Sequence, residues 1–159
     1  MTIKEIFGAN RFEITSKGRI GCRGIIIKDS RILLIHGLQA DFFMIPGGGQ
    51  ELNETLENCC IRELQEETGH IIEPCKEGAF LQLHEYYEEY HYINYFYTCE
   101  IVGTAIKNLT EVEIERKLVS EWVDWNVALN IFSHYIDFAA TNEIKMRAYL
   151  RDYTALLSI

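Results

Sequence analysis

Three glutamates at helical spacing are the first feature of the sequence that could do chemistry. Glu63, Glu66 and Glu67 stand at i, i+3 and i+4, so their carboxylates converge on one patch of a helix. Like charges at this spacing repel, and the patch therefore favours a compensating cation. Arg62 is one candidate. A hard divalent ion such as Mg²⁺ is the better one, because it prefers carboxylate oxygens and is usually completed by substrate phosphates.

A run of glycines before the helix changes how the patch is interpreted. A solvated acidic face is the common fate of a glutamate-rich helix, and the helix alone slightly favours that interpretation. However, Pro46 is followed by Gly47, Gly48 and Gly49, where the backbone can turn tightly and approach a ligand or a metal closely. The loop and the helix together favour a binding site.

The helix that carries the glutamates is predicted from its ends and its apolar row. Asn53 is a suitable N-cap, and Gly69 stands where glycine commonly ends a helix. Apolar residues at four-residue spacing should face a core, and they are Leu56, Cys60 and Leu64. The acidic residues border this row, so we expect them at the edge of the buried surface rather than in open solvent.

The loop and the helix, taken at their fixed spacing, resemble the Nudix box. The matching positions are Gly48, Glu54, Arg62, Glu63, Leu64, Glu66, Glu67 and Gly69. His70 departs from the signature, which has an aliphatic residue there; this position concerns packing rather than the carboxylates. The resemblance implies an α/β fold, an α/β/α sandwich with a mixed central sheet. It also implies a metal-dependent pyrophosphohydrolase that cleaves a nucleoside diphosphate linked to another group.

The resemblance also implies roles for the residues of the helix. Glu63, Glu66 and Glu67 would hold Mg²⁺, with Mn²⁺ as a substitute, or activate the attacking water. Which of the three acts as the general base stays open. Arg62 would orient them. A Nudix fold used as a non-catalytic nucleotide sensor is the alternative, but all three acids and the arginine are present, which argues against it.

Further residues are implied around the helix. Glu54 would support the loop–helix geometry or the metal site. Gly47 and Gly48 would contact the substrate, and the Gly47 carbonyl would be a further metal ligand. In some Nudix enzymes a glutamate from a later loop reaches the metal; Glu121 resembles that residue, and Glu115 is its competitor.

The sequence says less about the substrate. Phe43 is expected to pack under the loop, with stacking on a base as the less favoured role. Some dinucleoside polyphosphate hydrolases carry a tyrosine where Tyr86 and Tyr87 stand. Some ADP-ribose hydrolases carry a proline there, and its absence from Leu83 to Tyr87 counts weakly against that substrate. A nucleoside triphosphate, a dinucleoside polyphosphate and a nucleotide sugar all stay open.

Composition sets the class of protein. The 159 residues, of which 48% are hydrophobic, predict one domain, 1–159, with a proper core. The net charge of −9 argues against general nucleic-acid binding. The five cysteines lack disulfide or zinc spacing, and no apolar run reaches the ~20 residues of a membrane helix, so we expect a cytoplasmic protein that binds no membrane. The oligomeric state stays open, with a homodimer common among relatives.

Alternating and continuous apolar runs predict the remaining elements. Strands are expected at 19–28, 31–36, 79–87, 90–102 and 121–125, with an edge strand around Phe12 and Ile14. Residues 103–120 are expected to form a flexible connection. One helix should run from Asp124 or Asn126 to Phe138, and a last helix should follow a cap at Thr141.

Overall fold

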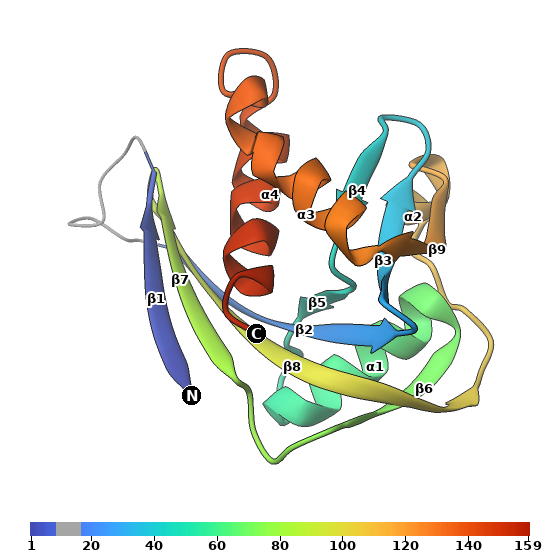
Figure 1. Cartoon of the computed structure of the whole chain (residues 1–159). Helices are drawn as coiled ribbons and strands as arrows, with labels where there is room; N and C mark the ends of the chain where they lie inside the picture. The colour runs from blue at the N-terminus through green and yellow to red at the C-terminus, as the bar shows by residue number, and fades with distance from the viewer. Residues whose placement is uncertain (9–16) are drawn as a thin grey trace.

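The computed structural model describes residues 1–8 and 17–159, which form a mixed sheet with helices on both faces (Figure 1). Phe12 and Ile14 lie outside the described residues. The strands are β1 (Thr2–Phe7), β2 (Lys17–Lys28), β3 (Arg31–Gly37), β4 (Phe42–Met44), β5 (Gly47–Gly49), β6 (His70–Pro74), β7 (Leu81–Tyr87), β8 (Tyr90–Thr104) and β9 (Leu118–Asp124). The helices are α1 (Leu56–Thr68), α2 (Glu111–Glu115), α3 (Trp125–Ser133), the 3₁₀ helix η1 (His134–Phe138) and α4 (Glu143–Leu156). This architecture confirms the predicted α/β/α sandwich.

The sheet runs in the order β1-β7-β8-β2-β3-β4, with β5 beside β2, β6 beside β8 and β9 beside β3. β1 pairs with β7 and β2 pairs with β8 in parallel, while the other pairs are antiparallel. The hairpin between β2 and β3 turns at Asp29 and Ser30, whose φ angles of 51° and 58° are those of the two central residues of a type I′ turn. This hairpin was predicted from the sequence.

Two cores lie on opposite faces of the sheet, as the continuous apolar runs of β2 and β3 predicted. In β2, Ile25 belongs to the core under α3 and α4, and its neighbour Ile26 belongs to the core under α1. Successive strand residues point to opposite faces, so a strand buried on both faces needs apolar residues at successive positions. Figure 1 shows α1 on one side of the sheet and α3 with α4 on the other.

The helix of the acidic patch begins later than the sequence suggested. Thr55 is the N-cap, and its hydroxyl accepts a hydrogen bond from the Asn58 N–H over 3.1 Å. Asn53 instead adopts a left-handed conformation (φ 62°) in the turn before the helix, which asparagine tolerates. Gly69 ends the helix in the left-handed region, as predicted. Cys60 and Leu64 are fully buried against the sheet.

Several other boundaries differ from the predictions. The expected flexible connection contains α2, because Thr110 and Glu113 form a capping box that stabilises a short helix. Asn142 rather than Thr141 caps α4. The strands β1, β4, β5 and β6 were not predicted. No helix of the described residues is long and apolar enough to cross a membrane.

Candidate active site

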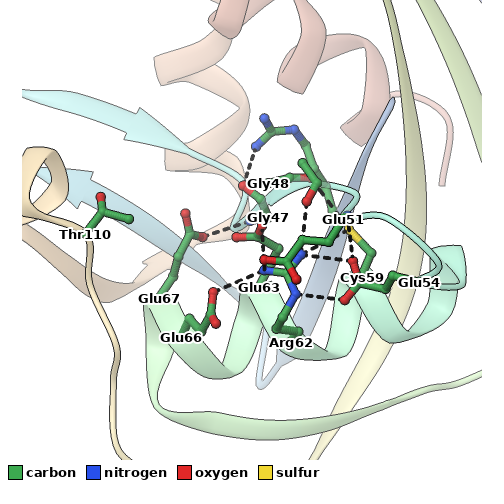
Figure 2. A network of polar contacts seen from close by, with 12 residues as sticks. Gly47, Gly48, Glu51, Glu54, Cys59, Arg62, Glu63, Glu66, Glu67 and Thr110 are labelled. Carbon is green, nitrogen blue, oxygen red and sulfur yellow. Dashed lines mark hydrogen bonds and ion pairs between the residues drawn. The ribbon is translucent and has the colours of Figure 1, made fainter. Parts of the chain in front are cut away.

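Arg62 lies at the centre of the acidic patch (Figure 2). Its Nη1 donates to Glu63 Oε1 over 2.9 Å and to Glu66 Oε2 over 3.2 Å. Its Nη2 donates to the Gly49 carbonyl oxygen over 3.0 Å. One guanidinium group therefore holds two carboxylates of α1 and the backbone of the glycine loop in a fixed arrangement.

Glu54 braces the other side of this guanidinium. Its two carboxylate oxygens accept hydrogen bonds from Arg62 Nε and Nη2 over 2.7 and 3.0 Å. The same carboxylate accepts the Glu51 N–H over 3.0 Å. The bond to Arg62 in particular lowers the pKa of Glu54 to about 2, so the pair is charged at every ordinary pH. These contacts connect loop and helix, which is one of the two roles expected for Glu54.

Glu67 is the buried member of the patch. Only 7% of its surface is exposed, and its Oε2 accepts the Gly47 N–H over 2.8 Å. Burial raises the pKa of Glu67 to about 8, against the opposing effect of that hydrogen bond. A carboxyl group in this position is largely protonated at neutral pH unless a cation lies beside it.

Gly48 allows the loop to touch the patch. A Cβ atom added at Gly48 would lie 2.4 Å from Glu63 Oε2, so any side chain there would displace that carboxylate. Gly47 has a φ of 143°, and a Cβ atom there would lie 2.1 Å from the Cys22 carbonyl oxygen. The glycines are therefore required by contact with β2 and α1.

The oxygens of this patch are those that a hard divalent cation prefers. No three His, Cys, Asp or Glu side chains within 1–8 and 17–159 are already grouped as a metal site, and Arg62 holds the carboxylates of Glu63 and Glu66. The buried carboxyl of Glu67, with its raised pKa, is the group that a cation would stabilise most in its charged form. The residues fit a cation that substrate phosphates help to bind.

A cleft of about 970 Å³ opens beside the patch, a volume suited to a nucleotide-sized ligand. Its acidic lining is Glu51, Glu63, Glu66, Glu67, Glu85, Glu88 and Glu113. Arginines and tyrosines from β2, β7, β8, α4 and the segment after α2 also line it, and they are Arg19, Arg23, Tyr87, Tyr90, Tyr92, Arg116, Arg147 and Arg151. An acidic patch and a group of arginines thus share one cleft, which suits a phosphate ligand bound with a cation.

A later acidic residue lines the same cleft, and it is neither Glu121 nor Glu115. Glu113 of α2 lines the cleft, and its charge adds to the burial that raises the pKa values of Glu63 and Glu67. Glu121 lies on β9, where its Oε1 is 2.9 Å from His36 Nδ1, and it is absent from the cleft lining, as is Glu115. The capping-box spacing from Thr110 was the signal that could have revealed the local structure around Glu113.

A comparison with protein families matches residues 19–140 to the NUDIX domain. The chain belongs to the NUDIX family. A putative ADP-ribose pyrophosphatase, YjhB, from Bacillus subtilis is 28% identical over 82 residues, which are 50% of this chain and 39% of that protein. An ADP-ribose pyrophosphatase from Methanocaldococcus jannaschii is 49% identical over 51 residues, 30% of each chain. The matches therefore span well under half of these relatives.

Solved structures share the Nudix fold. A NUDIX hydrolase from Nitrosomonas europaea aligns with a TM-score of 0.59 and 20% identity over 87% of this chain and 90% of its own. A UDP-X diphosphatase aligns with a TM-score of 0.59 and 16% identity over 91% of this chain and 64% of its own. At such identities the likeness shows the fold alone. The resemblance inferred from the Nudix box is confirmed.

Two residues expected near the substrate lie elsewhere in this Nudix domain. Tyr86 stacks on His91 at 4.4 Å between ring centroids, on the face of β7 away from the cleft, while Tyr87 lines the cleft. Adjacent strand residues point to opposite faces, so only one of the two tyrosines could face the substrate. Phe43 stacks on His36 at 3.9 Å and packs against the core, which was its favoured role, and Phe42 lines the cleft instead.

His70, the position that departs from the Nudix box, begins β6. Its backbone N–H donates to the Thr68 hydroxyl over 3.2 Å. Its Nδ1 is buried and has no hydrogen-bond partner among the described residues. The substitution therefore changes packing at the end of α1, and His70 is not part of the cleft lining.

Proposed function

We propose that the protein is a metal-dependent pyrophosphohydrolase that cleaves a phosphoanhydride bond in a nucleoside diphosphate derivative. The observation that supports this most is the buried Glu67 carboxyl, held by the Gly47 N–H beside Glu63, Glu66 and a cleft lined by arginines. A buried acid with a raised pKa in a cleft is typical of a site that binds a cation or transfers a proton. Mg²⁺ is the proposed metal, with Mn²⁺ as a substitute.

The chain supplies the positions that such hydrolysis needs. A bound Mg²⁺ would neutralise charge on the phosphate oxygens and lower the pKa of a water molecule. Glu63, Glu66 and Glu67 would hold it, and a carboxylate of the patch would accept the proton of the attacking water. Arg62 keeps two of these carboxylates and the glycine loop in register, so that the water and the phosphorus atom meet in a defined geometry.

Two further residues complete the proposed machinery. Glu113 lines the cleft from α2, a different element from the helix of the patch, and would supply a fourth carboxylate to the metal or to the water. Arg23 is half-buried at the cleft, where its Nη1 donates to the carbonyl oxygens of Ile45 and Gly47 over 2.9 and 3.4 Å. These bonds support the proposal that its guanidinium binds a substrate phosphate next to the glycine loop.

ADP-ribose is the substrate to test first, because both curated relatives are described as ADP-ribose pyrophosphatases, one of them as putative. The deciding experiment incubates the protein and its Glu67→Gln variant with ADP-ribose, UDP-glucose, diadenosine polyphosphates and nucleoside triphosphates, each with Mg²⁺ or with EDTA. We expect release of a nucleoside monophosphate or of pyrophosphate by the wild type in Mg²⁺ alone. A panel without any metal-dependent release would contradict the proposal.

A further inference from the structure

A second group of buried polar side chains lies in the cleft on β7, β8 and α4. Glu85 is 5% exposed and Asn94 is 7% exposed, and the Asn94 amide donates to Glu85 Oε2 over 2.6 Å. Arg151 is 9% exposed, and its Nε donates to Asp152 Oδ1 over 2.7 Å. Burying this many polar groups is costly unless each finds a partner. Most of these groups have one.

Two atoms of this group do not. The Nη2 of Arg151 and the hydroxyl of Tyr87 are buried and have no hydrogen-bond partner within the described residues. Both side chains line the cleft, and they are close enough that the charge of Arg151 acts on the pKa of Tyr87. An unsatisfied buried donor costs on the order of 1–3 kcal/mol, so two of them in one cleft point to a missing acceptor.

The chemistry of the surroundings identifies that acceptor. Arg151 Nη2 can only donate, and the Tyr87 hydroxyl can donate its proton, so one acceptor would suit both groups. The Arg147 guanidinium, 3.8 Å from the centre of the Tyr87 ring, adds positive charge nearby. Arg23 lines the same part of the cleft.

Two acids lie near the unsatisfied donors, and both already accept hydrogen bonds. Asp152 accepts from Arg151 Nε over 2.7 Å and from the Ile45 N–H over 2.9 Å. Glu85 accepts from Asn94 and has its pKa raised by burial. A ligand atom here must accept hydrogen bonds, and negative charge on it is favoured.

We propose that Arg151 and Tyr87 form an oxyanion subsite, separate from the metal-binding patch, which binds a phosphate or carboxylate group of the substrate. Two parts of a substrate could supply this group. One is the second phosphate of the anhydride, and the other is an anionic substituent on the group beyond it. The identity of the substrate that carries the anion rests on the proposed function. Binding of the anion at the subsite itself requires neither metal nor turnover.

The test measures metal-free binding of inorganic phosphate by isothermal titration calorimetry in EDTA. Loss of one charge-assisted hydrogen bond, about 1.5–3 kcal/mol, corresponds to roughly a 10- to 100-fold rise in Kd, which we expect for Arg151→Gln. Tyr87→Phe should raise the Kd about three- to tenfold. Because the Tyr87 hydroxyl has no hydrogen-bond partner among residues 1–8 and 17–159, Tyr87→Phe should not lower the melting temperature. Arg151→Gln should lower it, because the bond from Arg151 to Asp152 is lost.

Matched controls separate the subsite from general effects. Tyr86→Phe removes the same atom from the neighbouring residue on the other face of β7, and Arg31→Gln removes the same charge from an exposed position. Both should leave phosphate binding unchanged. Wild-type protein that binds no phosphate at tens of millimolar, or a Tyr87→Phe variant that binds it as well as wild type, would overturn the assignment.

A second titration identifies the source of the anion and uses UDP-glucose and UDP-glucuronate, in which a carboxylate replaces the hydroxymethyl group of the glucose. A weakening by Tyr87→Phe that is confined to the uronate supports a subsite for a remote anionic substituent. Equal weakening for both ligands supports a subsite for a phosphate of the anhydride. Hydrolysis assays in Mg²⁺ are read separately, so an inactive protein that still shows these differences would contradict the proposed function and leave the subsite standing.

Discussion

The backbone N–H of Gly47 donates a 2.8 Å hydrogen bond to the buried carboxylate of Glu67. This contact joins the start of the glycine loop to the last turn of α1, at the point where both border the cleft. A carboxyl group placed there lacks water, and one backbone donor does not replace its hydration. The protein therefore holds an acid whose charged form is unfavourable until a cation arrives.

Glu67 should make the metal-free protein less stable as the pH rises. Its pKa is about 8 when folded and ordinarily near 4.5, so between these values only the unfolded chain loses the proton. The free energy of unfolding therefore falls as the pH rises from 4.5 to 8. Glu67→Gln should be more stable than wild type by about 4 kcal/mol at pH 8 and should match it near pH 4. Urea unfolding in EDTA measures this difference.

Glu67→Gln should also lose the stabilisation and the catalysis that a bound metal provides. Mg²⁺ should raise the melting temperature of the wild type and should have little effect on Glu67→Gln, whose turnover should fall by about 10²- to 10⁴-fold. Glu66→Gln is the control for the pH effect, since the Glu66 side chain is 31% exposed. Equal pH profiles for wild type and Glu67→Gln would show that the buried carboxyl is not held as described.

Gly48→Ala should remove activity without unfolding the protein. The added Cβ would overlap the end of the Glu63 side chain, which is flexible and can swing away, so the cost to stability should be about 1 kcal/mol or less. The displaced carboxylate could not then bind the metal together with Glu67. Gly18→Ala is the matched control, because its Cβ would lie an ordinary 3.6 Å from the nearest atom, the His91 carbonyl oxygen. Hydrolysis rates beside circular dichroism melts separate the two effects.

Arg62 should not be replaceable by lysine. Its planar group donates to both oxygens of Glu54 and also to Glu63, Glu66 and the Gly49 carbonyl, which one ammonium group cannot reach together. We expect Arg62→Lys to destabilise the protein by about 1–3 kcal/mol and to reduce turnover by at least tenfold. A double-mutant cycle with Glu54→Gln should show a coupling of about 1 kcal/mol or more. Additive effects would mean that the two side chains do not act as a unit.

The part of the site that the sequence predicted is the part built within one short segment. Between Gly47 and Glu67, the spacing of the residues predicts which side chains share a face of α1. It also predicts that the backbone of the glycine loop lies beside them. The cleft's other residues depend on strand register. Tyr86 and Tyr87 have the same side chain and adjacent positions, and only the pairing of β7 with β8 decides which one faces the ligand.

Strand pairing between distant parts of the sequence also determines where the Glu121 side chain lies. The register of β9 against β3 places Glu121 opposite Leu34, and its carboxylate meets His36 on the neighbouring strand. Burial lowers the pKa of His36, but its bonds to Glu121 and Asp41 outweigh this and raise it, so the histidine and the glutamate satisfy each other. No local pattern around Glu121 could have revealed a partner 85 positions earlier in the chain.

We therefore expect replacement of Glu113 to reduce turnover and replacement of Glu121 to leave it unchanged. Glu113→Gln removes the charge but keeps an acceptor for the Thr110 N–H, whose bond to Glu113 Oε2 is 2.7 Å, so the capping box and α2 should survive. We expect turnover to fall about 10- to 100-fold and the Mg²⁺ concentration needed for half-maximal rate to rise. Glu115→Gln and Glu121→Gln should keep wild-type rates, because neither side chain lines the cleft.

The pH dependence of the Glu113 variant gives an independent measure of the same placement. The charge of Glu113 contributes to the raised pKa of Glu67, so its removal should lower that pKa and reduce the loss of metal-free stability between pH 4.5 and 8. Glu115→Gln should leave this loss unchanged. A Glu113→Gln protein that keeps both the pH–stability profile and the turnover of the wild type would contradict this placement. Glu113 would then neither affect the pKa of Glu67 nor supply a fourth carboxylate to the site.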